Sequence, residues 1–401
     1  MSVKIPSWKL VVLIFIPLVY ILAGLLFIVL IKADVIEKLP ARPLDLVEKD
    51  SLREGEAPDI AAAEAFVREK LKQENGHINL YYPAQSSESR RTNSEAASYY
   101  LLWNAVERNK REFDLQLDFL KENMIHPTGG YLMWRLEGDD KPITDGSNIA
   151  TDADLRTIKA LLIAEKQWDD EKYTEHIDSL AEALENIAIT NDGLFSPYGG
   201  VRETGELWKT QEVWLSYSDF EVFRELSYRR GEPWKGVYDN TKKKILQSQL
   251  PIGFYNAKLD EQRNFLNFDE VNGQKRYSIN SLWVMVRAAE SRDKELQASA
   301  HKALDFYKSE YAEKAMIDSV YDSDGNGLSG GDSAWVYALV GRAAVALDEE
   351  NFSAEMMKKL KEKQILNESS ELYGAFPEGN NVAGQFTTQE SILTVQDYLR
   401  S

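Results

Sequence analysis

Two carboxylates open an apolar, alanine-rich stretch at residues 150–168. Asp152 and Asp154 stand at its start, in Ala-Thr-Asp-Ala-Asp-Leu-Arg. The stretch predicts a helix, and acids in the first turn of a helix face the positive end of its dipole, where they stay ionised and oriented. Either acid alone is also explained as a helix-capping residue. The pair together indicates a site that uses carboxylates.

A third acid, Glu95, opens another predicted helix, in Thr-Asn-Ser-Glu-Ala-Ala-Ser-Tyr-Tyr-Leu-Leu-Trp. A Ser-Glu helix start is common, so Glu95 alone would not indicate a site. It becomes a candidate because Asp152 stands at the start of a later helix. Hydrolysis of a glycosidic bond needs a protonated acid beside the leaving oxygen and an ionised carboxylate across the sugar. In inverting enzymes these two groups lie about 6.5 to 9.5 Å apart, with room for a water molecule.

Both runs resemble glycoside hydrolase family 8. Its signature has Ala, Ser or Thr, Asp, Ala or Gly, and Asp leading into a helix of small residues that ends in an aromatic one. The stretch at 150–168 follows this pattern except at Thr157 and Ile158. The family's general acid lies in a Ser-Glu-Gly stretch, which Glu95 matches, with Ala96 in place of the glycine.

The resemblance implies a role for each acid. Glu95 would be the general acid, with its pKa raised by burial among Tyr99, Trp103 and nearby carboxylates. Asp152 would hold the sugar in the cleavage subsite. Asp154 would contact the residues that touch the sugar, or serve as a helix N-terminal acid. We also include it among the candidate substrate-binding residues.

The general base is where the sequence departs from the family. In cellulase-like members the base is an Asp in a Tyr-Asp-Ala-x-Arg stretch, and the nearest stretch here has Ser278 at that position. We therefore predict that Asp219, on the third predicted inner helix at the expected rim, activates the water. Asp260 and Asp269 are alternatives, and Asp219 is otherwise a plain helix N-terminal acid.

Aromatic side chains are expected to bind the sugar, because their flat faces suit sugar rings and their polar edges suit hydroxyl groups. Trp134 lies in Gly-Gly-Tyr-Leu-Met-Trp-Arg, which resembles the family's loop with a sugar-stacking aromatic residue. Tyr99, Tyr217 and Tyr277 complete the predicted substrate-binding set. Aromatic residues inside helices more often belong to the core.

Helical periodicity dominates from Pro58 onward, with about twelve predicted helices of two alternating kinds. One kind is rich in Lys, Glu and Asp, and the other carries more Ala, Trp, Tyr and Leu. The second kind begins near residues 95, 152, 213, 278, 332 and 387. A helix that is apolar all round is buried, and one with a polar face lies outside. The alternation predicts an all-α fold, an (α/α)6 toroid, which the family resemblance also implies, with the long loops at one rim.

The N-terminal part predicts a membrane anchor. Residues 10–31 are uncharged and, at roughly 33 Å as a helix, long enough to cross a bilayer. No A-x-A-like cleavage site follows closely, which favours an uncleaved anchor over a signal peptide. We therefore predict a cytoplasmic tail at 1–9, a transmembrane helix at 10–31, a linker at 32–57 and a glycosidase domain at 58–401.

Composition excludes several classes of function. The formal charge of −18 argues against a nucleic-acid partner, since phosphate backbones are bound by Lys and Arg in excess. The chain has no cysteine, which excludes a disulfide scaffold. Its four histidines show no zinc-ligand spacing. Asp322-Ser-Asp-Gly-Asn-Gly starts like a calcium loop but lacks the final Glu and is interpreted as a turn. We expect no cofactor and no metal.

The sequence therefore predicts a membrane-anchored, extracellular, inverting endo-glycosidase that cuts an exopolysaccharide or a related β-linked polysaccharide. Its expected partners are the polysaccharide, the membrane through the N-terminal helix, and exopolysaccharide synthesis or export machinery. One alternative is a polysaccharide-binding protein that lost its base at Ser278. Another is a lyase on a similar toroid, which would need a Tyr, His or Lys base.

Overall fold

The computed structural model describes most of the chain beyond residue 54. The described residues are 55–84, 86–137, 139–142, 149–267, 269–271, 274–328, 331–379 and 382–401. Within them, no helix is both long and apolar enough to span a membrane. The predicted tail at 1–9, the predicted span at 10–31 and the linker up to residue 54 lie outside the described residues.

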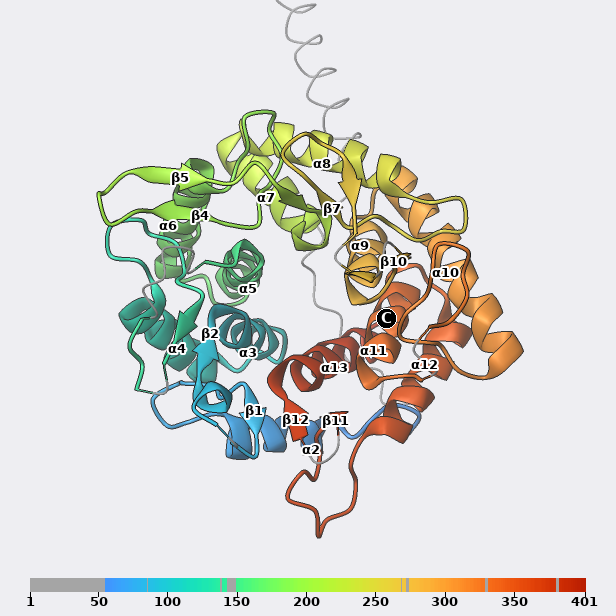
Figure 1. Ribbon diagram of the computed structural model, residues 1–401. Coiled ribbons are helices and arrows are strands. Elements are labelled where there is room, and N and C mark those ends of the chain that lie inside the picture. The colour runs from blue at the N-terminus through green and yellow to red at the C-terminus, as the bar shows by residue number, and fades with distance from the viewer. Residues whose placement is uncertain are drawn as a thin grey trace, which may run out of the picture. The chain divides into compact units, whose positions relative to one another are not determined.

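Six helices form an inner ring (Figure 1). They are α3 (Ser94–Val106), α5 (Thr151–Trp168), α7 (Phe220–Arg230), α9 (Ile279–Glu290), α11 (Ala334–Ala346) and α13 (Gln385–Tyr398). Each contacts the next along the chain, and α13 contacts α3, so the ring closes.

Six outer helices cover this ring, one before each inner helix. They are α2 (Ile60–Phe66), α4 (Lys110–Phe119), α6 (Glu171–Ile187), α8 (Trp234–Ser248), α10 (Lys294–Lys314) and α12 (Glu350–Lys363). Two of them continue into π-helical turns, η1 (Val67–Leu71) and η3 (Leu120–Met124). The described residues therefore have the predicted alternation of inner and outer helices.

Burial explains which helices lie inside. Every residue of α5 from Thr151 to Ala164 is buried, whereas α6 buries a stripe at three- and four-residue spacing that includes Tyr173, Ile177 and Leu184. The small and aliphatic residues of α5 pack on all sides, and the charged residues of this run are buried as well, with Arg156 paired to Asp152 and Lys159 to Glu221. The stripe on α6 covers the ring with one face and leaves Lys and Glu in water.

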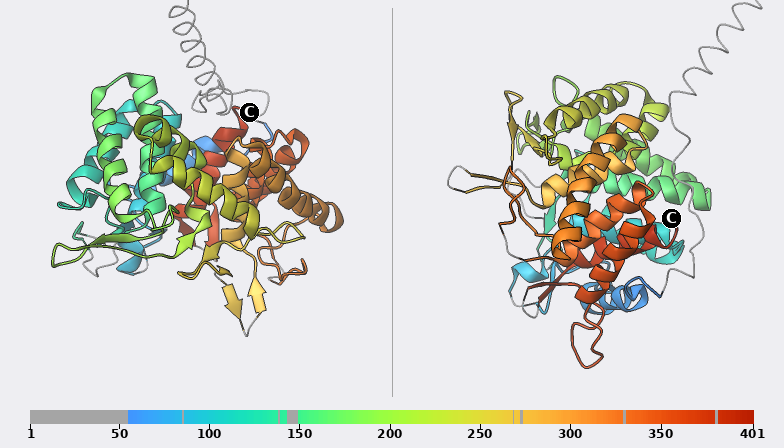
Figure 2. Two further views of the ribbon diagram at one scale, coloured as in Figure 1. Left: turned by 90° about the horizontal axis from the view of Figure 1, so that it is seen from above. Right: turned by 90° about the vertical axis from the view of Figure 1, so that its right-hand side faces the viewer.

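Short strands occupy the loops that lead into the inner helices, and Figure 2 shows them on one side of the helices. They form five small antiparallel sheets. The strands are β1 (Tyr81–Tyr82), β2 (Thr92–Asn93), β3 (Arg135–Leu136), β4 (Gly199–Val201), β5 (Leu207–Lys209), β6 (Val213–Trp214), β7 (Lys258–Leu259), β8 (Phe265–Leu266), β9 (Asp269–Val271), β10 (Gln274–Arg276), β11 (Pro377–Gly379) and β12 (Val382–Gly384). Two 3-10 turns, η2 (Glu88–Arg90) and η4 (Leu215–Tyr217), complete this rim.

The third inner helix differs from the prediction, which began it at residue 213. Helix α7 begins at Phe220, because Asp219 caps it: its Oδ1 accepts hydrogen bonds from the backbone N–H groups of Glu221 (3.1 Å) and Val222 (3.0 Å). Residues 213–217 instead form strand β6 and turn η4. This places Tyr217 on the rim, ahead of the helix.

Candidate active site

Glu95 lies in the first turn of α3 and is part-buried. Its Oε2 accepts hydrogen bonds from Trp134 Nε1 (2.8 Å) and Asn93 Nδ2 (3.1 Å). Its Oε1 accepts none from a described residue. Burial and the neighbouring Asp152 raise the pKa of Glu95 to about 7, against the lowering effect of Trp134 and the nearby arginines.

Asp152 lies in the first turn of α5, and its carboxylate is held on one side only. Arg156 Nη2 donates to Oδ2 at 2.9 Å, while Arg156 Nη1 donates to Ser98 Oγ at 3.0 Å. Asp152 Oδ1 is buried and has no hydrogen-bond partner among the described residues. One carboxylate oxygen is therefore available to a ligand or a water molecule.

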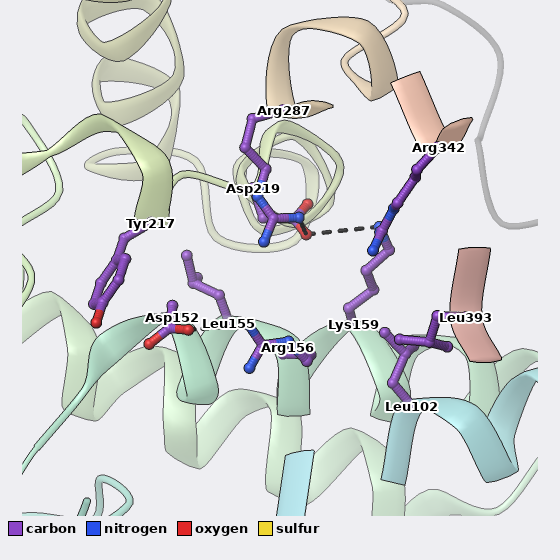
Figure 3. Close-up of a pocket in the computed structure, with 10 residues that line it drawn as sticks. All are labelled: Leu102, Asp152, Leu155, Arg156, Lys159, Tyr217, Asp219, Arg287, Arg342 and Leu393. Carbon is purple, nitrogen blue, oxygen red and sulfur yellow. Dashed lines mark hydrogen bonds and ion pairs between the residues drawn. The ribbon is translucent and has the colours of Figure 1, made fainter. Parts of the chain in front are cut away.

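A small cavity connects Asp152 to the centre of the ring. Its volume is about 10 Å³, enough for one water molecule. Its lining is mostly charged: Leu102, Asp152, Leu155, Arg156, Lys159, Tyr217, Asp219, Arg287, Arg342 and Leu393. Figure 3 shows Tyr217 and Asp152 at one end and Arg342 at the other.

Asp219 lines this cavity, but its carboxylate is already engaged. Oδ1 caps α7, and Oδ2 lies 3.6 Å from Lys159 Nζ and 3.7 Å from Arg287 Nη1 (Figure 3). Burial tends to raise the pKa of Asp219, but Lys159 and Arg287 outweigh it and the pKa is lowered. A capped, ion-paired carboxylate of low pKa is a poor proton acceptor, so this geometry does not support the predicted base.

Three residues of the predicted substrate-binding set are buried. Asp154 is fully buried, and its Oδ1 accepts a hydrogen bond from the backbone N–H of Leu132 (2.9 Å). Tyr99 is 3% exposed and lies under the guanidinium of Arg156, whose carbon is 3.9 Å from the ring centroid. Tyr277 is 2% exposed and stacks on a buried phenylalanine. At this burial the three side chains offer no surface to a ligand, and Tyr99 contacts the arginine that orients Asp152.

Trp134 and Tyr217 remain part-exposed at the rim. Besides donating to Glu95, Trp134 has the guanidinium of Arg135 over its ring, 3.5 Å from the centroid. A sugar could therefore stack only on its other face. Burial, Asp152 and Glu95 all raise the pKa of Tyr217, so its hydroxyl stays protonated beside both acids.

The structure describes the side chain of only one of the two alternative bases, Asp260 and Asp269. Asp260 closes a turn, because its carboxylate accepts hydrogen bonds from the backbone N–H (2.7 Å) and the side-chain amide (2.9 Å) of Asn264. Asp269 lies in β9, and its side chain is outside the described part of the structure. Ser278 precedes α9 and is part-exposed.

Sequence reasoning missed Arg156, which orients Asp152. The signal was present, because an arginine four residues after an aspartate on a helix faces it. The calcium-like loop is a turn: Asp322 accepts hydrogen bonds from the backbone N–H groups of Asp324 and Asn326, both at 2.9 Å. Among the described residues, no three His, Cys, Asp or Glu side chains are grouped to hold a metal ion.

The profile of the glycosyl hydrolases family 8 matches residues 64–257, and no curated protein sequence matches the chain. Similar solved structures include an α-amylase from Clostridium perfringens, with 23% identity, a TM-score of 0.73, and coverage of 84% of this chain and 97% of that one. PssZ from Listeria monocytogenes has 17% identity, a TM-score of 0.64, and coverage of 88% and 97%. The family 8 endoglucanase Cel10 from Klebsiella pneumoniae has 17% identity, a TM-score of 0.58, and coverage of 75% and 97%. At these identities the structural likeness concerns the fold alone. The profile match assigns residues 64–257 to glycosyl hydrolase family 8, and with it the protein is a glycoside hydrolase.

Proposed function

We propose that the protein is an inverting endo-hydrolase of a polysaccharide, with Glu95 as its general acid. The arrangement that carries this is Glu95 in the first turn of α3, where burial and the neighbouring carboxylate of Asp152 raise its pKa to about 7. An acid with this pKa is about half protonated at neutral pH and can protonate a leaving oxygen. The proton has a place on Oε1, because both hydrogen bonds from Trp134 and Asn93 go to Oε2.

Inversion also needs a carboxylate that activates water. Among the described residues we assign this to Asp152, because its Oδ1 is unpartnered and lies by the cavity while Arg156 fixes Oδ2. In the family resemblance this residue holds the sugar instead. Asp269 is the alternative base. Asp219 is not assigned as the base; its carboxylate pairs with Lys159 and Arg287 beside the cavity.

A row of aromatic rings leads away from Asp152 and fits an extended sugar chain. Its members are Tyr217, Trp214, Tyr198 and Trp208, with successive ring centroids 5.0, 6.0 and 6.3 Å apart. All four are part-exposed. Successive rings are inclined to one another by 72°, 82° and 51°. Because the face of an aromatic ring binds a sugar unit, a row of part-exposed rings supports action within a chain.

We further propose that the substrate is a β-linked exopolysaccharide at the outer cell surface, with residues 10–31 as the anchor. The similar fold of the Klebsiella endoglucanase supports a β-glucan-like substrate. The similar α-amylase favours a second candidate, an α-glucan, which the same pair of acids could cleave with inversion. Ser278 stands where cellulase-like members of the family have their catalytic base. This favours a third candidate, a polysaccharide-binding protein without catalytic activity.

The test uses the full-length protein in detergent with β-1,4-glucan, xylan, chitosan, α-1,4-glucan and the host's own exopolysaccharide. Proton NMR of the first products reports their anomeric form, and inversion is expected. Glu95→Gln and Asp152→Asn should each lower kcat about 100-fold or more. Asp219→Asn and Ser278→Ala should stay within about tenfold of wild type.

Each outcome has a clear meaning. A collapse of kcat in Asp219→Asn or Asp269→Asn, with Asp152→Asn active, would move the base to that residue. Binding without cleavage on the whole panel would support the binding protein. For the anchor, protease added to intact, wall-stripped cells should cut the domain; protection until lysis would contradict the outward orientation.

A further inference from the structure

The two acids of the proposed mechanism lie in the first turns of neighbouring inner helices, Glu95 on α3 and Asp152 on α5. These two helices pack directly against each other. Hydrolysis with inversion requires a fixed separation between the two carboxyl groups, with room for one water molecule. Contacts that hold the first turns of α3 and α5 together therefore influence the geometry of the reaction.

Arg156 lies one helical turn after Asp152 on α5, and Figure 3 shows both side chains at the cavity. Its Nη2 donates to Asp152 Oδ2 at 2.9 Å. Residues four positions apart on a helix face each other whatever lies outside the helix. This ion pair alone therefore orients Asp152 on its own helix and does not relate it to α3.

Ser98 extends the contact to α3. Arg156 Nη1 donates to Ser98 Oγ at 3.0 Å, and the hydroxyl of Ser98 donates to the backbone carbonyl oxygen of Glu95 at 2.9 Å. A serine hydroxyl has one hydrogen to donate and lone pairs that accept, so both contacts are satisfied together. A continuous chain of hydrogen bonds thus joins the carboxylate of Asp152 to the backbone of Glu95.

The surroundings of this chain hold it in one arrangement. Ser98, Arg156 and Asp152 are all buried. The ring of Tyr99 lies under the guanidinium of Arg156, whose carbon is 3.9 Å from the ring centroid. A planar guanidinium that stacks on a ring and donates two hydrogen bonds has a fixed orientation. Away from water, such hydrogen bonds are also electrostatically stronger.

We propose that Ser98 and Arg156 form a bridge that fixes Asp152 relative to Glu95 and thereby sets the spacing of base and acid. The proposal rests on the function proposed above for these two acids. Both bridge residues are positioning residues, because they act through Asp152 and Glu95. The bridge holds Asp152 by Oδ2 and leaves Oδ1, which has no hydrogen-bond partner among the described residues, to the water molecule.

Two substitutions remove different parts of the bridge. Ser98→Ala removes the hydroxyl that crosses to α3 and keeps the ion pair on α5. Arg156→Lys keeps the positive charge but replaces the planar, two-pronged donor by a single ammonium group. Ser353→Ala is the matched control, because Ser353 is buried in the outer helix α12 and its hydroxyl also donates to the carbonyl three residues earlier, that of Glu350, at 2.9 Å.

The first measurement needs no substrate. Melting temperatures of the full-length protein in detergent are compared for the single variants and for the double variant with Ser98→Ala and Arg156→Lys. Because the hydroxyl and the guanidinium interact, Ser98→Ala should lower the melting temperature less once Arg156 has been replaced. Ser353→Ala should have the same effect in both backgrounds. Additive effects of Ser98→Ala and Arg156→Lys would overturn the bridge.

The second measurement uses the polysaccharide that the wild type cleaves. Ser98→Ala should lower kcat about tenfold, the scale of one hydrogen bond to a charged group, and leave KM within about twofold. In the Asp152→Asn background it should cause little further loss, because the bridge acts through that carboxylate. Ser353→Ala should leave kcat unchanged in both backgrounds. An equal loss from Ser98→Ala in both backgrounds, or a change in KM alone, would overturn the proposed spacing of base and acid.

The pH profile separates the charge of Arg156 from its geometry. The titratable, charged and indole groups that act on Glu95 or respond to it are Asp152, Arg156, Arg135, Trp134 and Tyr217. The charge of Arg156 lowers the pKa of Glu95, so Arg156→Gln should move the falling limb of kcat to higher pH. Arg156→Lys keeps the charge and should lower kcat with the limb near its wild-type position.

Two further outcomes decide between the bridge and the proposed function. A kcat that falls in Arg156→Gln and stays at the wild-type value in Arg156→Lys would show that charge alone matters, and would overturn the bridge. If no polysaccharide is cleaved while the melting temperatures of Ser98→Ala and Arg156→Lys are non-additive, the proposed function fails and the link between α3 and α5 stands.

Discussion

At the residue scale, the chemistry of Glu95 is set by opposing influences. Burial and the charge of Asp152 favour the protonated acid, while the hydrogen bond from Trp134 and the charges of Arg156 and Arg135 favour the ionised form. The resulting pKa is about 7, so both the protonated and the ionised form of Glu95 are populated near neutral pH. A single change at Trp134 can therefore shift the pH dependence without touching the acid itself.

Trp134→Phe is expected to move activity to higher pH. The acid must be protonated to act, so kcat falls as pH rises through the pKa of Glu95. Removing the indole N–H removes a hydrogen bond that stabilises the ionised form, which raises this pKa and moves the falling limb upward. A kcat profile from pH 5 to 9 measures the shift. A limb that stays in place or moves downward would contradict the role given to Trp134.

At the element scale, composition predicted the inner and outer helices well because burial on all sides demands small and apolar residues. Helix α13 departs from this rule: its Gln385, Thr388, Gln389 and Glu390 are all fully buried. Two of these groups pair inside the ring: Gln389 Nε2 donates to Gln385 Oε1 within α13, and Arg342 Nη1 of α11 donates to Glu390 Oε1, both at 2.8 Å. The Arg342–Glu390 pair joins two helices distant in sequence, so periodicity alone could not predict it.

The loop before β3 depends on α5 through Asp154. Burial raises the pKa of Asp154 well above its ordinary value, so folding favours the protonated, neutral form. An acid whose pKa is raised on folding stabilises the protein below its ordinary pKa. The free energy of unfolding of the wild type therefore falls as pH rises from the ordinary pKa to the raised one.

Asp154→Asn should escape this penalty. The amide oxygen still accepts from Leu132 N–H and carries no charge at any pH. The free energy of unfolding of Asp154→Asn should therefore rise relative to that of the wild type as pH increases above about 4, the ordinary pKa of an aspartate. Asp154→Ala, which leaves that buried N–H unpaired, should lose about 1–3 kcal/mol. Urea unfolding at several pH values checks both; a constant difference between Asp154→Asn and wild type would show that Asp154 is ionised in the folded protein.

At the scale of the whole molecule, the sequence predicted a ring but only part of its site. Glu95 and Asp152 could be proposed from the sequence because each opens an inner helix, and helix starts are visible in sequence; their catalytic roles stay predictions. The state of Asp219 was not predictable, because Lys159 and Arg287 come from other helices and meet it only in the folded ring. Likewise, the burial of Tyr99 and Tyr277 depends on neighbours that the sequence does not reveal.

Closure of the ring joins its first and last helical pairs. Gln364, after α12, accepts the backbone N–H of Asp59 and donates to the carbonyls of Asp59 and Gly374. Gly374 has φ of 89°, and a Cβ there would lie 2.1 Å from the carbonyl oxygen of Ala62 in α2. Only glycine allows the two backbones to approach this closely.

Gly374→Ala is therefore expected to weaken the closure. The clash with backbone and the left-handed φ should together cost about 2–4 kcal/mol in the free energy of unfolding. Gly236→Ala, inside α8, is the matched control: its Cβ would meet only the flexible side chain of Glu232, and alanine is the better helix former, by up to about 1 kcal/mol. Thermal unfolding measures both. Since neither position touches Glu95 or Asp152, kcat of the folded fraction should stay unchanged; a Gly374→Ala protein as stable as the wild type would show that the two ends of the chain can separate without cost.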